Sequence, residues 1–288
     1  MSVTVVVPTV DRVALLRRCL RGLEGADVLV VHDGDPGIAA LLEEMGVRAL
    51  RISERGVSAK RNAGWRAAQG DLVAFTDDDC EPAPGWLPGL VAAAQDGDLV
   101  AGPVRPHPED AAEGLWARTV TSERPGFYPG CNLLVRREFL ERVGGFDERL
   151  NGGEDTDLAW RVREAGGRPA WAADGLVWHA VRAVTFSQQL RSLPRWAGLA
   201  LVVRRHPQLR ELGHRRWFWK ATHPVALLAL VGLVAVPFLW WTALAALPLL
   251  VSRVRRAGVR GGLQLAVNDV AETLVMLAGS VRYGALLL

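Results

Sequence analysis

Through its first hundred residues the chain alternates short apolar runs with segments of helical pattern. The apolar runs are rich in valine and span residues 3–7, 28–31, 47–52 and 72–75. The helical patterns that follow them span residues 13–23, 38–45, 58–68 and 86–94. Strands that are apolar on both faces, each followed by a helix, are typical of a largely parallel sheet with helices on both sides. The sequence therefore predicts an α/β fold.

Beyond this region the pattern is interrupted by prolines and then resumes. Residues 103–130 are predicted to form a long loop that borders the ligand site, because loops of this length in a compact domain are usually functional or mobile. Strands are predicted at residues 131–135 and 176–178, and helices at 138–143 and 156–165. We accordingly expect one domain over residues 1–205, with His179 at the end of its last strand.

Polar clusters follow three of the predicted strands, at residues 8–11, 32–35 and 77–79. Ligands of open parallel sheets bind outside the carboxyl ends of the strands. Since these clusters all lie at such ends, one pocket can collect them.

The cluster Asp77, Asp78 and Asp79 sits directly after an apolar run, where a buried strand should end. Adjacent carboxylates raise each other's pKa unless a cation lies among them, and Mg²⁺ or Mn²⁺ held by one or two carboxylates usually shares its remaining positions with water and phosphate. The triplet thus indicates a metal site that serves phosphate chemistry. The alternative is an acidic turn that caps the next helix.

Lys60 and Arg61 occupy the start of a predicted helix, where the helix dipole disfavours cations by roughly 0.3–1 kcal/mol each. An anionic ligand would reverse that penalty, whereas a solvated basic pair is the alternative. Glu154 and Asp155 follow two glycines at the start of another predicted helix, where a cap explains one acid well. A carboxylate partly removed from water there can also act as a general base. His179 alone is more typical of a hydrogen-bonded histidine, but a nearby acidic metal site would favour a ligand.

The net charge of +3 is too small to indicate nucleic acid, and we expect no nucleic-acid partner. The three cysteines, at positions 19, 80 and 131, are odd in number and widely spaced, which argues against a disulfide framework and a CxxC-type zinc site. A reducing compartment fits them. The first residues contain neither a basic region nor an apolar stretch typical of a secretory signal, so we expect the first domain to face the cytoplasm.

Residues 225–251 are apolar except for Thr242, and Pro237 divides them near the middle. Basic residues lie on both sides, so a single crossing would violate the positive-inside rule. Two hypotheses remain: a helical hairpin with both flanks cytoplasmic, or one crossing paired with another through residues 270–288. We favour a hairpin or re-entrant pair, followed by an amphipathic surface helix at about 263–288. The alternative is a buried hairpin of a soluble protein. In the favoured interpretation, residues 206–288 form a second, membrane-associated helical region.

Taken together, the motifs resemble the family 2 inverting glycosyltransferases, which have the GT-A fold with a Rossmann-like mixed sheet. The resemblance covers roughly the first 205 residues. It rests on six motifs in the family's order and on one histidine: residues 5–9, 31–34, 60–64, 75–79, 144–147 and 153–157, and His179.

The resemblance implies a role for each candidate residue. The nucleotide would contact a set of residues at the strand ends and the helix start: Pro8, Thr9, Asp11, Asp33, Lys60, Arg61, Asp77 and Asp78. Asp77 and Asp79 match the family's DxD motif, with Asp79, Asp77 and His179 as candidate ligands of Mg²⁺ or Mn²⁺. Asp155 matches the catalytic base, and Glu154 accompanies it.

These roles predict a metal-assisted transfer of sugar from a nucleotide-sugar donor to a hydroxyl of a glycan or lipid-linked acceptor. We expect the reaction at the cytoplasmic face of the membrane, in the biosynthesis of cell-envelope glycans. A nucleotidyltransferase on a similar fold and a catalytically silent membrane scaffold are the alternatives.

Overall fold

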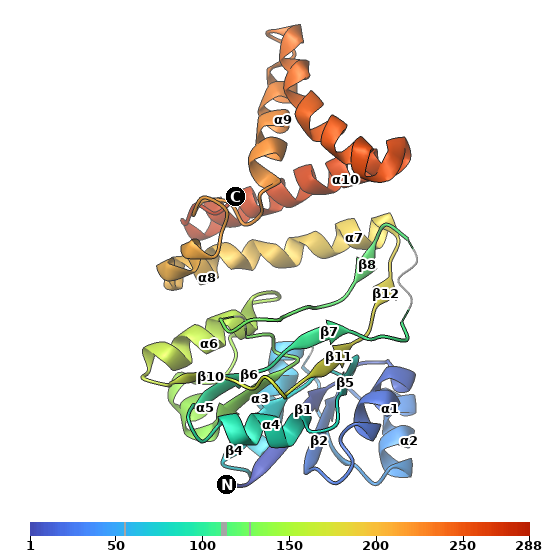
Figure 1. Ribbon diagram of the computed structural model, residues 1–288, viewed down its shortest axis with the longest axis vertical. Helices are drawn as coiled ribbons and strands as arrows, with labels where there is room; N and C mark the ends of the chain where they lie inside the picture. The colour runs from blue at the N-terminus through green and yellow to red at the C-terminus, as the bar shows by residue number, and fades with distance from the viewer. Residues whose placement is uncertain (55, 111–113, 127) are drawn as a thin grey trace. The chain divides into compact units, whose positions relative to one another are not determined.

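The computed structural model describes residues 1–54, 56–110, 114–126 and 128–288 (Figure 1). Its contacts divide the chain into two compact units. The first comprises Met1–Ala112 and Arg118–Arg182, and the second Glu113–Ala117 and Ala183–Leu288. The predicted domain boundary lay at residue 205, whereas here residues 183–205 group with the later helices, because the helices they form pack against the last helix of the chain.

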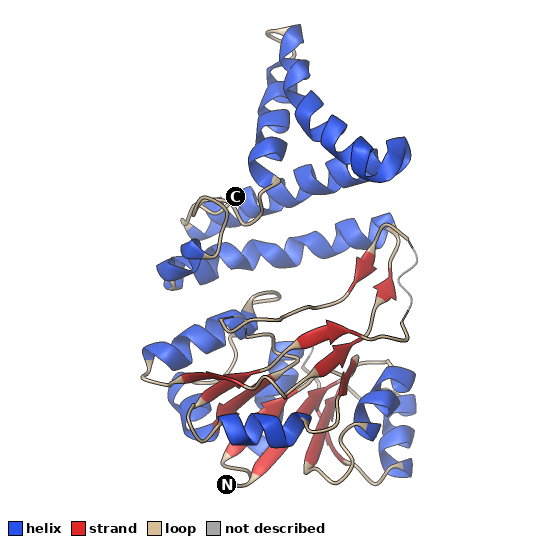
Figure 2. Cartoon of the chain, in the orientation of Figure 1, coloured by secondary structure: helices blue, strands red, loops and turns tan. Residues whose placement is uncertain are grey.

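A seven-stranded mixed sheet forms the centre of the first unit (Figure 2). Its strands, in the order β10-β6-β9-β4-β1-β2-β3, are β10 (Pro169–Trp171), β6 (Leu99–Ala101), β9 (Leu133–Arg136), β4 (Leu72–Phe75), β1 (Val3–Pro8), β2 (Val28–His32) and β3 (Arg48–Arg51). β9 runs antiparallel to both β4 and β6, and the other neighbours are parallel. The α/β class and the mixed sheet are confirmed, while the short strands β6 and β10 lie outside the predicted runs.

Helices cover both faces of this sheet. On one face lie α1 (Val13–Arg21), α2 (Pro36–Glu44) and α4 (Trp86–Ala93), and on the other α3 (Val57–Ala67), α5 (Arg137–Val143) and α6 (Glu154–Glu164). Successive residues of a strand point to opposite faces, so Val5 and Val7 join one hydrophobic core while Val6 joins the other. This double burial explains why the strands are continuous apolar runs.

A second, three-stranded sheet lies at the end of β4. It consists of β5 (Cys80–Pro82), β11 (Val177–His179) and β7 (Val104–Pro106), with β11 antiparallel to β5 and parallel to β7. A two-stranded ribbon follows, formed by β8 (Ala117–Arg118) and β12 (Arg182–Ala183). The predicted loop at residues 103–130 therefore contains β7 and β8, and its residues 111–113 and 127 lie outside the described part of the chain.

The second unit is helical. It contains α7 (Phe186–Ser192), η1 (Leu193–Gly198), α8 (Leu199–Arg205), η2 (Pro207–Glu211), α9 (His223–Ala235), η3 (Trp240–Ala246) and α10 (Leu247–Tyr283). α10 is kinked at Ala257 and Gly258, where the backbone angles are not helical. Figure 1 shows α9 and the first part of α10 as two arms that meet at an apex.

The apolar stretch at residues 225–251 forms this helical pair, not one continuous helix. α9 ends at Ala235, two residues before Pro237, which lacks the N–H that would continue the helical hydrogen bonds. Among the residues that the structure describes, no helix combines the length and the apolar character that a membrane crossing requires.

The last helix differs from the expectation in the direction of its polar side. We predicted an amphipathic surface helix at about 263–288, but its polar residues Asn268, Asp269 and Glu272 are buried. Arg253 Nε lies 2.6 Å from Asp269 Oδ2, and Lys220 Nζ lies 2.6 Å from Glu272 Oε1. These ion pairs compensate for the removal of the carboxylates from water. The Arg253–Asp269 pair spans the kink within α10, whereas Lys220 comes from the segment before α9.

Candidate active site

The first candidate residues meet at the carboxyl edge of the sheet. Thr9 follows β1 and Asp33 follows β2, and these two strands are direct neighbours. Lys60, from α3, reaches both: its Nζ lies 2.6 Å from the Thr9 carbonyl oxygen and 3.2 Å from Asp33 Oδ2. The structure therefore brings these three predicted nucleotide contacts together. Pro8 is buried at the end of β1, and Asp11 is exposed in the turn that follows.

The three acids of the triplet have different surroundings. Asp77 Oδ1 accepts a hydrogen bond of 2.6 Å from Arg61 NH2. Asp78 is fully buried and accepts hydrogen bonds from the Thr9 hydroxyl, at 2.6 Å, and from Arg12. Burial raises the pKa of Asp78 to about 6, although Arg12 and the Thr9 hydroxyl oppose the shift. Asp78 thus fixes the positions of Thr9 and Arg12 through buried hydrogen bonds. Its contact with a nucleotide stays a prediction.

Asp79 has basic groups on several sides. Arg12 NH1 is paired with Asp79 Oδ2, and Arg182 NH2 lies 3.5 Å from the same oxygen. His179 Nε2 lies 3.6 Å from Asp79 Oδ1. The sequence predicted a cation among these acids, and here the side chain of Arg12 already supplies one to Asp78 and Asp79.

Asp79, Cys80 and His179 form a group whose ligand atoms all lie within 4.8 Å of one another. The pairing of β11 with β5 sets this arrangement, since His179 is the direct partner of Cys80 across the two strands. His179 Nδ1 lies 2.8 Å from the Ala180 carbonyl oxygen, which can only accept, so Nδ1 carries the hydrogen and Nε2 is the atom that faces Asp79. Metal-bound histidines typically have such a second hydrogen bond.

Within this group Asp79 suits Mg²⁺ or Mn²⁺, because these ions favour carboxylate oxygens, and the His179 imidazole is a common protein ligand of metal ions. Cys80 fits poorly, since burial raises the pKa of its thiol well above the ordinary value and thiolates suit softer metals. Asp77, the third predicted ligand, is instead held by Arg61. The arrangement therefore offers a two-residue protein site with room in the coordination shell for other ligands.

The Glu-Asp motif begins α6, after Gly153 in a left-handed conformation. Glu154 is buried, and its Oε1 lies 3.2 Å from Arg61 NH1. Burial and the neighbouring Asp155 charge raise the pKa of Glu154 to about 7, which Arg61 only partly opposes. Asp155 is partly exposed, and its Oδ2 accepts a 3.0 Å hydrogen bond from the Gly130 N–H. One acid of the motif is thus structural, while the other is oriented and accessible.

Arg61 joins the two acidic motifs. Its guanidinium binds Asp77 through NH2 and Glu154 through NH1, and it lies 5.4 Å from the centre of the Phe146 ring. The side chain is only 3% exposed. The basic pair at the start of α3 is therefore buried and paired with carboxylates of the protein, so it is not solvated, and its contact with an anionic ligand stays a prediction.

Sequence reasoning missed Arg12, Cys80 and Arg182. Almost all of the 34 basic residues are arginine, so a single arginine carries little signal. A signal for Arg12 was its position three residues after Thr9, at the end of a predicted strand.

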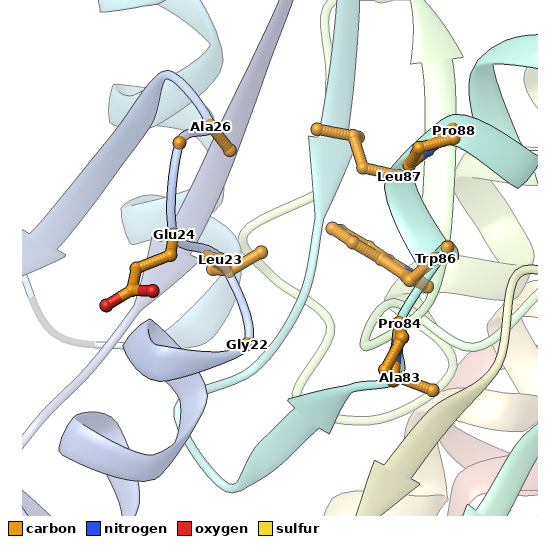
Figure 3. A pocket seen from close by; sticks show the side chains of 11 residues that line it. Gly22, Leu23, Glu24, Ala26, Ala83, Pro84, Trp86, Leu87 and Pro88 are labelled. Carbon is orange, nitrogen blue, oxygen red and sulfur yellow. The ribbon is translucent and has the colours of Figure 1, made fainter.

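A cavity of about 380 Å³ lies elsewhere in the first unit, between the segment after α1 and the start of α4 (Figure 3). Its lining includes Leu23, Glu24, Trp86 and Leu87 and contains none of the predicted site residues. The candidate active site is thus defined by its network of polar side chains and not by this cavity.

Comparisons with known proteins agree with the fold. The models of glycosyl transferase family 2 and of glycosyl transferase family group 2 match residues 4–146 and 115–255. These two matches together span residues 4–255, and with the relatives below they show that the chain is similar to the family 2 glycosyltransferases.

The pre-mycofactocin glycosyltransferase of Mycobacterium tuberculosis (strain CDC 1551 / Oshkosh) is 31% identical over 202 residues, which cover 62% of this chain and 42% of that protein. The N-acetylglucosaminyl-diphospho-decaprenol L-rhamnosyltransferase of the same strain is 34% identical over 114 residues, 39% of this chain and 36% of that protein. The chain thus spans less than half the length of these two relatives.

Among solved structures, the mannosyltransferase PcManGT from Pyrobaculum calidifontis, in complex with GDP-Man and Mn²⁺, superposes with a TM-score of 0.58. The sequence identity is 20%, and the match covers 98% of this chain and 86% of that chain. At this identity the likeness concerns the fold, which is the GT-A type that the resemblance predicted.

Proposed function

We propose that this protein is an inverting glycosyltransferase, which moves a sugar from a nucleotide-diphosphate donor to an acceptor hydroxyl. The observation that carries the proposal is the Arg61 guanidinium, which holds Asp77 of the DxD motif and Glu154 of the Glu-Asp motif at 2.6 and 3.2 Å. One side chain thereby places the acids that would face the donor next to the helix that carries Asp155. The two mycobacterial relatives, both named as sugar transferases, support the same reaction class.

The donor would bind at the carboxyl edge of the sheet. Asp33 and the Thr9 region are held together by Lys60, and an Asp33 carboxylate oxygen can accept a hydrogen bond from a ribose hydroxyl. Two proposed contacts, Asp11 and Asp77, are not enclosed in the core and complete this set.

Asp79 and His179 would hold Mg²⁺ or Mn²⁺, and PcManGT was solved with Mn²⁺. When bound there, the metal supplies neutralisation of the negative charge on a diphosphate. Arg12 and Arg182 already face Asp79, so they can add positive charge at the same place.

Asp155 would act as the general base. Its Oδ2 is oriented by the Gly130 N–H, and its position at the start of α6 keeps it partly exposed. As the acceptor oxygen forms a bond to the anomeric carbon, the bond from that carbon to the phosphate oxygen breaks, and the acceptor proton passes to Asp155. A single displacement of this kind inverts the configuration and releases a nucleoside diphosphate.

The acceptor and the cellular place are part of the proposal. We infer a glycan or lipid-linked acceptor, such as a polyprenol-linked lipid, at the cytoplasmic face of the membrane, in the synthesis of cell-envelope glycans. The apolar residues of α9 and η3 support this location, because many of them are exposed.

The test is a turnover screen of nucleotide sugars with the full chain, with and without a chelator. Asp155→Asn is the inactive variant, and Asp96→Asn, a change of an exposed acid outside the site, is its matched control. We expect a nucleoside diphosphate as product, lost with chelator and in Asp155→Asn. Pyrophosphate would indicate a nucleotidyltransferase, and no nucleotide binding in the presence of Mn²⁺ would indicate a scaffold.

A further inference from the structure

The pair formed by α9 and the segment from η3 to the kink of α10, residues 223–256, is called the apolar hairpin below. Its two arms are held together by small residues. Ala226, Ala229 and Ala246 are buried in one cluster with Leu249 and with Ala266, which lies beyond the kink of α10. A Cβ added at Gly232 would lie 2.5 Å from the Ala245 Cβ, so only glycine allows this approach.

Most of the large apolar side chains of the hairpin point outward, with the buried Leu249 as an exception. Val234 is 66% exposed, Phe238 86% and Trp240 79%, and further exposed members are Leu228, Val231, Trp241, Leu244, Leu247 and Val251. A soluble helical pair buries its large side chains and exposes polar ones. Small residues inside and large apolar residues outside are typical of helices that pack in lipid.

The polar groups of the hairpin also fit an apolar surrounding. Thr242 is the only polar side chain between residues 225 and 251, and its hydroxyl donates to the Gly232 carbonyl oxygen at 2.8 Å. Inside a bilayer each such group must be satisfied within the protein, and this one is.

Asp269 and Glu272 are buried against the hairpin, where Arg253 and Lys220 pair with them, and the exposed charge beside it is positive. The sequence has no acidic residue between Glu211 and Asp269. Arg255 and Arg256 end the second arm, Arg260 follows it, and all three are exposed. Exposed arginines beside an apolar surface favour an anionic membrane, and they also disfavour the association of two identical basic hairpins.

The length of the hairpin limits its depth. α9 has 13 residues, or about 20 Å at a rise of about 1.5 Å per residue. The hydrocarbon core of a bilayer is about 30 Å thick, so an arm of this length passes the middle without reaching the far side.

From these observations we infer that the apolar hairpin inserts into an anionic bilayer from one side without crossing it, with Arg255, Arg256 and Arg260 at the headgroups. The inference deepens the proposed membrane-face location and rests on it. It does not depend on the sugar-transfer chemistry, since every group that carries it belongs to the second unit.

The test is flotation of the full chain with vesicles of phosphatidylcholine alone or mixed with phosphatidylglycerol. Phe238→Asp changes a side chain that is 86% exposed, and Val281→Asp makes a comparable change at a 78% exposed residue of α10 outside the hairpin. We expect stronger binding to the anionic vesicles, about tenfold or more weaker binding for Phe238→Asp, and little change for Val281→Asp. Equal losses in both variants, or equal binding to both vesicles, would overturn the inference.

Depth is tested with Phe238→Cys, because the three native cysteines are buried. A membrane-impermeant maleimide should label this cysteine in solution but not in vesicles, whether added outside or enclosed within. Labelling from the vesicle interior would show that the hairpin crosses, and labelling from outside would show that it stays out of the lipid. A dimer that forms through the hairpin and is lost in Phe238→Asp without vesicle binding would assign the surface to a second copy instead.

The two proposals fail separately. Phe238→Asp should keep turnover with a water-soluble donor if the sugar-transfer function is correct. Vesicle binding without any turnover would contradict the proposed sugar transfer but would still support the insertion of the hairpin into the membrane.

Discussion

Arg61 NH1 lies 3.2 Å from Glu154 Oε1, although the two residues are far apart in the sequence and both side chains are nearly sealed from solvent. The same guanidinium binds Asp77, whose side chain is 23% exposed, so three ionisable groups form one network that is buried at Arg61 and Glu154. Because burial penalises each charge, the network is stable only when it is complete.

Loss of Arg61 should therefore be strongly destabilising. Arg61→Ala leaves Asp77 and Glu154 without their cation, and we expect a loss of about 3–5 kcal/mol in the free energy of unfolding. Arg66→Ala, on the exposed side of the same helix, should cost less than about 1 kcal/mol. Urea unfolding of both variants measures the difference, and similar costs for the two would show that the network contributes little.

Glu154 should make stability depend on pH. Its pKa is about 7 in the folded protein against an ordinary value of 4.5, so the folded state binds an extra proton between these values. The contribution of Glu154 is fully present below about pH 4.5 and is lost as the pH rises through 7, by up to about 3 kcal/mol. Unfolding at pH 5 and pH 8 should show a steeper decline for the wild type than for Glu154→Gln, and parallel curves would refute the shift.

Asp155→Asn should separate binding from chemistry. The amide keeps the size of the side chain but cannot take the acceptor proton, so turnover should fall by about a hundredfold or more. Calorimetry should find an unchanged affinity for the nucleotide. Normal turnover, with Asp96→Asn as the matched control, would remove Asp155 from the role of base.

Asp79 and His179 should govern the metal dependence of nucleotide binding. We expect Asp79→Ala and His179→Ala to lose the gain in nucleotide affinity that Mn²⁺ gives to the wild type, measured by calorimetry with and without the metal. Cys80→Ser is the control, because it changes the third member of the group without removing a favoured ligand. An intact metal effect in both alanine variants would contradict the assignment.

Much of the first unit follows from local pattern. Three of the predicted apolar runs form β1, β2 and β4. The polar residues that follow these strands lie at one edge of the sheet: Thr9, Asp33 and Asp77. The short strands β6 and β10 were not predicted, since three residues provide too little periodicity to recognise.

The sequence by itself determined the α/β class, the acids at the strand ends and the apolar character of residues 225–251, because these depend on neighbouring residues and their periodicity. Only the tertiary structure decided the partners: Arg12 on Asp78 and Asp79, and His179 opposite Cys80. It also turned the polar side of α10 inward, where Lys220 and Arg253 neutralise it. Such choices depend on which distant side chains share a buried space, and spacing along a chain does not encode that.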